Sequence, residues 1–222
     1  MIKLLSNGCS FLTTRPRDGV DTFVTKILSE NYNLELINLA MGGRGNNRIS
    51  FSTKTWFEQY GHKDTFAVIG WSSAYRNDYV TNDPRKKDRL DGTDLTWRTW
   101  NTLDNVGFLR KKLPKLCHEN DAIMSFLDNV FDLQNYFERK KIPYVMYNAL
   151  PNNFKSNVSD FDIITKAINM DRFFNPEVSQ YEYITDKRLI VSPEDPHPST
   201  EGHLQWATQL KEFIDANNLR TS

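Results

Sequence analysis

Three polar residues that lie far apart in the chain have the side chains of a nucleophile, a base and an acid. Ser10 follows a short apolar run near the beginning, whereas Asp195 and His197 share one loop near the end. A serine hydroxyl becomes a nucleophile when a base takes its proton, and histidine suits that role because its pKa lies near neutrality. A carboxylate on the other ring nitrogen fixes the tautomer and stabilises the imidazolium. These residue types predict acyl chemistry at a serine, provided that the fold joins the two ends of the chain.

Each of these residues also has another interpretation. Serine is a preferred helix N-cap, so Ser10 can instead begin the next helix. Cys9 can be the nucleophile if a helix N-terminus lowers the pKa of its thiol, or it can be a small buried hydrophobe. Glu194, three residues before His197, is the alternative acid. We favour Asp195, because glutamate has one more methylene group and can point to solvent.

A glycine-rich segment, Asn38–Asn47, offers backbone N–H groups for the negative charge that an attack on a carbonyl creates. One preorganised donor of this kind typically contributes roughly a hundredfold or more in rate. A glycine is suited to the task because no side chain obstructs the approach to its N–H group. Gly42, Gly43 and Gly45 can also form a phosphate-binding turn, but the segment has neither the lysine of a P-loop nor a full dinucleotide fingerprint.

Alternating strands and helices must position these groups. The predicted strands are the apolar runs Ile2–Leu5, Leu34–Ala40, Phe66–Ile69, Tyr144–Tyr147 and Leu189–Val191. Apolar residues at helical spacing predict helices around residues 23–31, 49–60, 123–137, 159–168 and 204–214. Strands that alternate with helices usually pair in parallel and are covered by helices on both faces. The predicted fold is therefore an α/β/α sandwich of three layers around a mostly parallel, five-stranded sheet.

Such sheets bind their ligands beyond the carboxyl ends of the strands. Ser10, the glycine-rich segment, the segment after Ile69 and the loop of His197 each follow a predicted strand. We expect them to meet at one edge of the sheet.

An insertion of about residues 75–105 interrupts the alternation after the third predicted strand. It is polar and contains the basic run Arg85–Lys87, between Asp83 and Asp88, and two tryptophans, Trp97 and Trp100. A segment this long within a compact domain is typically a lid, a binding surface or a disordered excursion. The tryptophans can stack on a sugar, or they can pack the insertion onto the domain.

At this point the chain resembles the SGNH hydrolases, also called GDSL esterases, in the order of three short motifs. Gly8-Cys9-Ser10 stands where the family has its first block, which implies Ser10 as the nucleophile. The segment from Asn38 to Gly43 matches the spacing of the second block, which implies Gly43 as an oxyanion donor. Asp195-Pro196-His197-Pro198 matches the last block and implies His197 as the base. The resemblance implies a flavodoxin-like fold and one domain, residues 1–222, that includes the insertion.

The sequence departs from the family pattern at three places. Cys9 stands where the family has an aspartate, and Asp195 is one residue closer to the histidine than the usual acid. The third block normally contains an asparagine that donates to the oxyanion, and Ser72 occupies that position here. A serine hydroxyl can donate with less reach. The other candidates for the missing donor, or for substrate contacts, are Asn46, Asn47 and Arg76.

Composition narrows the classes of partner. The 28 basic and 28 acidic residues balance, so no net charge favours nucleic acid or an anionic membrane. Two cysteines make no disulfide framework, and no apolar run has the length of a membrane span or a signal-peptide core. We therefore expect a cytoplasmic protein, in an infected cell if the chain is virus-encoded. The oligomeric state stays open.

The expected function is a serine-dependent hydrolysis of a small ester through Ser10, His197 and Asp195. An O-acetyl group on a carbohydrate is one such ester. The alternatives are acyl transfer by the same residues and a catalytically inactive binding protein on this scaffold. We expect no cofactor and no metal, because His62, His118 and His203 are scattered without metal-ligand spacing.

Overall fold

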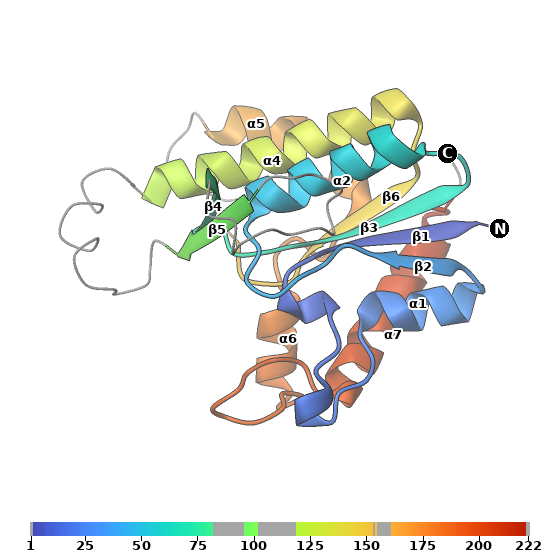
Figure 1. The fold of residues 1–222 in the computed structure, drawn as a ribbon, viewed down its shortest axis with the longest axis vertical. Coiled ribbons are helices and arrows are strands. Elements are labelled where there is room, and N and C mark those ends of the chain that lie inside the picture. The colour runs from blue at the N-terminus through green and yellow to red at the C-terminus, as the bar shows by residue number, and fades with distance from the viewer. Residues whose placement is uncertain (1, 82–95, 102–118, 153, 155–160, 221–222) are drawn as a thin grey trace.

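A five-stranded parallel sheet forms the centre of the computed structural model (Figure 1), which describes residues 2–81, 96–101, 119–152, 154 and 161–220. The strands are β1 (Lys3–Gly8), β2 (Glu35–Asn38), β3 (Thr65–Trp71), β6 (Tyr144–Asn148) and β7 (Phe173–Phe174). Their order in the sheet is β2-β1-β3-β6-β7, and all neighbours pair in parallel. This is the flavodoxin-like strand order, so the predicted fold class is confirmed.

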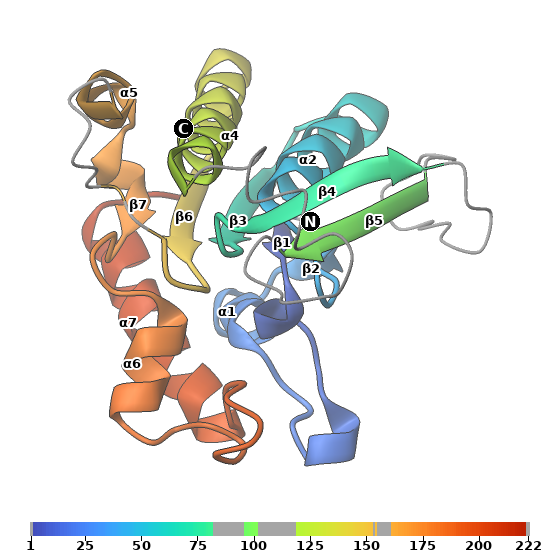
Figure 2. The same cartoon turned by 90° about the vertical axis from the view of Figure 1, so that its left-hand side faces the viewer.

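Helices cover both faces of the sheet (Figures 1 and 2). One face carries α1 (Val24–Tyr32), α6 (Gln180–Asp186) and α7 (Thr200–Ala216), and the other carries α2 (Asn46–Tyr60), α4 (Glu119–Lys140) and α5 (Phe161–Ala167). Three short 3₁₀ helices complete this part of the chain: η1 (Ser10–Leu12), η2 (Pro16–Asp18) and η6 (Met170–Arg172). The predicted helices are thus present, although residues 159 and 160, where the helix around 159–168 was expected to begin, lie outside the described residues.

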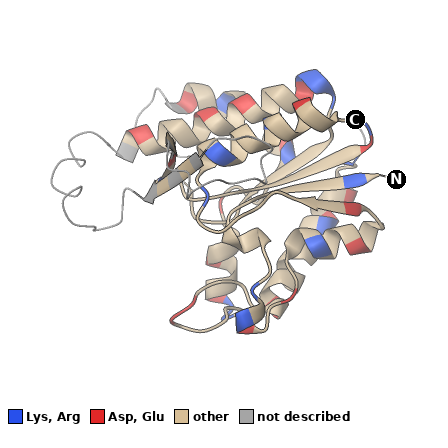
Figure 3. Ribbon diagram, viewed as in Figure 1, with Lys and Arg blue, Asp and Glu red and all other residues tan. Residues whose placement is uncertain are grey.

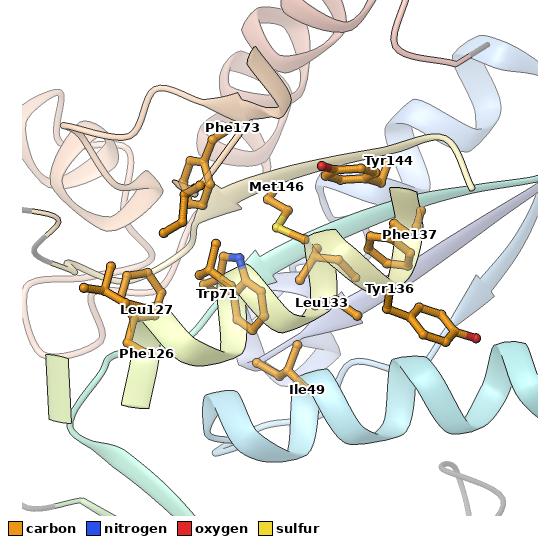
Figure 4. Close-up of a cluster of buried hydrophobic side chains, with 14 of the residues drawn as sticks. Ile49, Trp71, Phe126, Leu127, Leu133, Tyr136, Phe137, Tyr144, Met146 and Phe173 are labelled. Carbon is orange, nitrogen blue, oxygen red and sulfur yellow. The ribbon is translucent and has the colours of Figure 1, made fainter. Parts of the chain in front are cut away.

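The hydrophobic core consists of two clusters, one on each face of the sheet, because every central strand is buried on both faces. In β3, Phe66 and Val68 face α1 and α7, whereas Ala67, Ile69 and Trp71 face α2 and α4. Figure 4 shows the second cluster, where Trp71 from the sheet meets the aromatic and aliphatic side chains of α4. Burial on both faces explains why these strands appear in the sequence as continuous apolar runs rather than alternating ones.

Most charged residues lie on the outside of this sandwich, although Arg44, Arg48 and Asp78 are buried. Figure 3 shows basic and acidic residues together on the outer helices, while the middle of the sheet has neither. In the part of the chain that the structure describes, no helix is long and apolar enough to span a membrane.

The described part of the predicted insertion is a β-hairpin that stands beside the sheet (Figure 2). Strand β4 (Arg76–Thr81) pairs antiparallel with β5 (Thr96–Asn101). Trp97 is buried against α2, with its ring 5.4 Å from that of Phe51 and the guanidinium of Arg48 5.7 Å from its centre. Trp97 therefore packs the hairpin onto the domain. The basic run Arg85–Lys87 lies outside the described residues.

One predicted strand was wrong. Leu189–Val191 does not join the sheet; Ile190 forms only an isolated antiparallel bridge to Pro198. The fifth strand is β7, whose two residues are both buried at the edge of the sheet. The run at 189–191 looked like a strand because its side chains are apolar, but they pack partly buried beside α7, so burial rather than sheet pairing explains them.

Candidate active site

The side chains of Ser10 and His197 are in hydrogen-bond contact, although the residues are 187 positions apart in the chain. Ser10 Oγ lies 2.9 Å from His197 Nε2. Strand β1 ends at Gly8, Cys9 is in an extended conformation, and Ser10 is the first residue of η1. The chain thus turns sharply beyond the carboxyl end of β1 and leaves Ser10 half-buried at that edge.

Asp195 contacts the other ring nitrogen of His197. Its Oδ1 lies 2.5 Å from Nδ1, and the backbone N–H of His197 donates to the same oxygen at 3.3 Å. The carboxylate therefore holds both the ring and the backbone of the histidine. With Nδ1–H donated to Asp195, Nε2 is left as the acceptor for the hydroxyl of Ser10.

The loop that carries this pair is held by its own backbone. Asp195 N–H donates to the hydroxyl of Ser192 at 3.1 Å, and Val191 N–H donates to the carbonyl of His197 at 2.9 Å. Burial alone would raise the pKa of Asp195, but the hydrogen bonds from His197 and the charges of His197 and Arg15 lower it below its usual range. The carboxylate is therefore ionised at neutral pH.

Sequence reasoning missed Arg15. Its Nη2 forms an ion pair with Oδ2 of Asp195, and its Nε donates to Asp18 Oδ2 at 2.7 Å. A basic residue five positions after Ser10 was the available signal, but nothing local tells which acid it meets. Glu194 is exposed, and Asp195 is the acid that contacts His197.

The glycine-rich loop passes beside Ser10. A Cβ atom added to Gly42 would lie 3.9 Å from the Cβ of Ser10. Gly43 has a φ of 79°, a left-handed conformation that favours glycine, and has no side chain between its backbone and solvent. In the described part of the chain its N–H has no protein acceptor. The N–H of Ser10 also lacks an acceptor within η1, because it belongs to the first residue of that helix.

Two of the candidate polar residues are engaged elsewhere. Both ends of the Asn46 amide bind the backbone of Ser72: Oδ1 accepts from its N–H at 2.9 Å and Nδ2 donates to its carbonyl at 3.0 Å. The hydroxyl of Ser72 is fully buried and accepts from Arg76 Nη1 at 3.2 Å. Asn46 therefore fixes the end of β3, and we withdraw it as an oxyanion donor.

Asn47 is a different case. It is half-buried near the start of α2, and within the described residues its side-chain amide makes no hydrogen bond. It remains a candidate for a substrate contact.

Two further groups, Cys9 and His203, lie away from solvent. Cys9 is completely buried in the cluster below α7, so the hypothesis of a thiol nucleophile was wrong. His203 is also buried; burial and the nearby charge of His197 lower its pKa to about 3, so this imidazole is neutral. Among the described residues, no group of three or more histidine, cysteine or acidic side chains could hold a metal ion.

The fold is shared with esterases of known structure. The chain is similar to the psychrotrophic esterase EstA from Pseudoalteromonas sp., in a structure inhibited by monoethylphosphonate, with 12% identity, a TM-score of 0.54 and coverage of 97% of this chain and 98% of that one. It is similar to TesA with 10% identity, a TM-score of 0.54 and coverage of 97% and 99%. The YxiM protein of Bacillus subtilis gives 10% identity and a TM-score of 0.57, with this chain spanning 58% of it.

No family model and no curated protein matches the sequence. A structural likeness at 10–12% identity shows the fold alone, so the chemistry has to be argued from the side chains.

Proposed function

We propose that the protein is a serine-dependent hydrolase of a small ester. One observation carries the proposal: the unbroken series of contacts from Ser10 Oγ through His197 to Asp195 beyond the carboxyl end of β1. Nucleophile, base and orienting acid stand in the relation that activates a serine hydroxyl.

The reaction follows from the positions of these groups. His197 Nε2 takes the hydroxyl proton while Ser10 Oγ bonds to the acyl carbon, and the carbonyl oxygen becomes an oxyanion. The N–H groups of Ser10 and Gly43 are the proposed donors to that oxyanion. His197 then gives its proton to the alcohol oxygen as the ester bond breaks. A water molecule, deprotonated by the same nitrogen, releases the acid and restores the hydroxyl of Ser10.

Two likenesses support an ester as the substrate. EstA and TesA have the same fold, and EstA is named an esterase that a phosphonate inhibits. The three short motifs resemble the SGNH hydrolases, whose nucleophile and base fall on Ser10 and His197. A small acyl ester, such as an O-acetyl group on a carbohydrate, is the substrate class that we propose.

Labelling with a fluorophosphonate probe tests the proposal. The wild-type protein should take up one probe per chain at Ser10, Ser10→Ala should take up none, and His197→Ala should react at least about a hundredfold more slowly. Cys9→Ala is the matched control for the neighbouring thiol and should label normally. A folded wild-type protein that neither labels nor cleaves short-chain esters would favour an inert binding protein and overturn the proposal.

Product analysis separates hydrolysis from transfer. With p-nitrophenyl acetate as the substrate and a carbohydrate alcohol present, hydrolysis gives p-nitrophenol and acetate and leaves the carbohydrate without an acetyl group. If an acetyl ester of the carbohydrate forms, the protein is an acyltransferase that uses the same residues, and the proposal of a hydrolase is wrong.

A further inference from the structure

The carboxylate of Asp195 is shared between two cationic or cation-forming groups. Oδ1 contacts His197 Nδ1, whereas Oδ2 pairs with Nη2 of Arg15. Arg15 and Asp195 are both about one quarter exposed, so water screens the pair only in part. The series of side-chain contacts from Ser10 through His197 therefore does not end at Asp195. It continues to Arg15, which belongs to the same segment of the chain as Ser10.

The backbone holds Arg15 in a small closed loop. Arg15 N–H donates to the carbonyl of Val20 at 2.7 Å, and Val20 N–H donates back at 3.1 Å. Between them, Pro16 begins η2 and Gly19 takes a left-handed φ of 69° that closes the turn. Because Val20 is buried, this loop is anchored on the domain. Arg15 thus stands at a fixed place five residues after Ser10.

The guanidinium is also fixed at its second nitrogen. Arg15 Nε donates to Asp18 Oδ2 at 2.7 Å while Nη2 meets Asp195. A guanidinium is planar, stays charged, and has donors in a rigid fork. One side chain therefore spans from the loop after the nucleophile to the loop that carries the base.

We propose that Arg15 is a positioning residue of the active site: it orients Asp195, and Asp195 in turn orients His197. This inference rests on the proposed function. Arg15 itself touches neither the hydroxyl of Ser10 nor the reacting atoms; it acts through the acid.

The charges around His197 and Asp195 predict the direction in which the pH dependence of the rate changes when Arg15 is replaced. Among the residues that the structure describes, the titratable and charged groups that face His197 and Asp195 are Arg15, Asp18 behind Arg15, and the buried, neutral His203 from α7. The charge of Arg15 is one of the causes that lower the pKa of Asp195, so removing it raises that pKa and favours the protonated acid, which no longer orients His197 as a carboxylate does. The acidic limb of the rate profile therefore moves to higher pH.

The test measures the rate of fluorophosphonate labelling against pH for Arg15→Gln, Arg15→Lys and the wild type. Arg15→Gln should react about tenfold more slowly at neutral pH, which is the effect of losing one charged hydrogen bond. Its acidic limb should lie at higher pH. Arg15→Lys keeps the charge but not the fork, and should recover part of the rate and the wild-type limb. Arg17→Gln, which removes an exposed arginine of the same loop, is the matched control and should equal the wild type.

The outcomes separate the two proposals. A wild-type protein that does not label contradicts the proposed function. A wild-type protein that labels, beside an Arg15→Gln variant with the same rate and pH profile, contradicts the role of Arg15. If Arg15→Gln lowers the melting temperature, labelling is repeated below its transition with added guanidinium ion. A slower rate with an unmoved limb and no recovery by lysine or guanidinium would assign Arg15 a purely structural role and overturn the inference.

Discussion

The carboxylate of Asp78 lies against the backbone N–H of Gly45 at the beginning of helix α2. Oδ2 of Asp78 accepts that N–H at 2.8 Å and the N–H of Arg48 at 3.3 Å. Gly45 is the N-cap residue and has no side chain to cap the helix. The hairpin β4–β5 therefore supplies the capping group through Asp78. The capped residue, Gly45, is two positions after Gly43 in the chain. Burial raises the pKa of Asp78, although its hydrogen bonds and Arg48 oppose that shift.

Removing this cap should destabilise the protein. Asp78→Ala leaves two helical N–H groups without their acceptor and removes a buried carboxylate beside Arg48, so we expect a loss of about 2 kcal/mol in the free energy of unfolding. Urea denaturation measures it. Asp162→Asn, an exposed acid in the first turn of α5, is the control and should change little. A stable Asp78→Ala variant would mean that the hairpin does not hold α2.

A side chain at Gly45 should displace the hairpin. A Cβ atom there would lie 2.4 Å from the carbonyl oxygen of Arg76 and 2.8 Å from Asp78 Oδ2. Gly45→Ala should therefore cost about 1–3 kcal/mol by overpacking. In Gly42→Ala the new atom meets only an ordinary contact at 3.9 Å, so its melting temperature should stay near that of the wild type. Equal melting temperatures for the two variants would show that the hairpin yields without cost.

Two buried tyrosines of β6 should respond to phenylalanine in opposite directions. Tyr144 donates its hydroxyl to Glu138 at 3.0 Å, whereas the buried hydroxyl of Tyr147 has no partner in the described part of the chain. An unpaired buried hydroxyl has lost water without a replacement. We expect Tyr147→Phe to raise stability by about 1 kcal/mol and Tyr144→Phe to lower it by about as much. Chemical denaturation of both variants checks the signs, and a loss of stability in Tyr147→Phe would contradict the assignment.

His203 should make the protein less stable in mild acid. Its pKa is about 3 in the folded chain and about 6.5 when unfolded. Between those values the unfolded chain binds the extra proton, so the stability that this residue contributes is full above pH 6.5 and falls as the pH drops towards 3. The total loss is roughly 5 kcal/mol, because each unit of difference in pKa corresponds to about 1.4 kcal/mol.

Melting temperatures at pH 7 and pH 4.5 test this prediction. The difference between the two should be smaller in His203→Gln than in the wild type. The exposed His62 provides the control, since His62→Gln should keep the wild-type difference. An unchanged difference in His203→Gln would show that the buried imidazole is protonated without cost.

The layers of the fold could be predicted from the sequence because a strand that is buried on both faces appears as a continuous run of apolar residues. Continuous apolar runs, such as the one in β3, identify strands that are covered by helices on both sides. The same rule failed for Leu189–Val191, since a short apolar run is equally compatible with packing beside a helix. The edge strand β7 has only two residues and leaves no periodicity to detect.

The candidate site was predictable only as a set of residue types. Ser10, Asp195 and His197 could be chosen because their chemistry is specific and each follows a strand or a predicted strand. Asn46 shows the limit of prediction from sequence. Its side-chain amide makes hydrogen bonds to the backbone of Ser72, and no sequence pattern indicates that contact. Polar side chains choose partners by distance, and distance between remote segments depends on strand order and register.

The sequence by itself determined the alternation of strands and helices, the two-sided burial of the sheet and the short list of residues capable of acyl chemistry. Those properties reside in local composition and periodicity, which neighbouring residues decide. The tertiary structure alone decided that Ser10 meets His197 at 2.9 Å and that Arg15 meets Asp195. It also buried Cys9 and set Asp78 against Gly45. Such contacts join segments far apart in the chain, and they exist only after the packing of the whole domain has fixed where each strand ends.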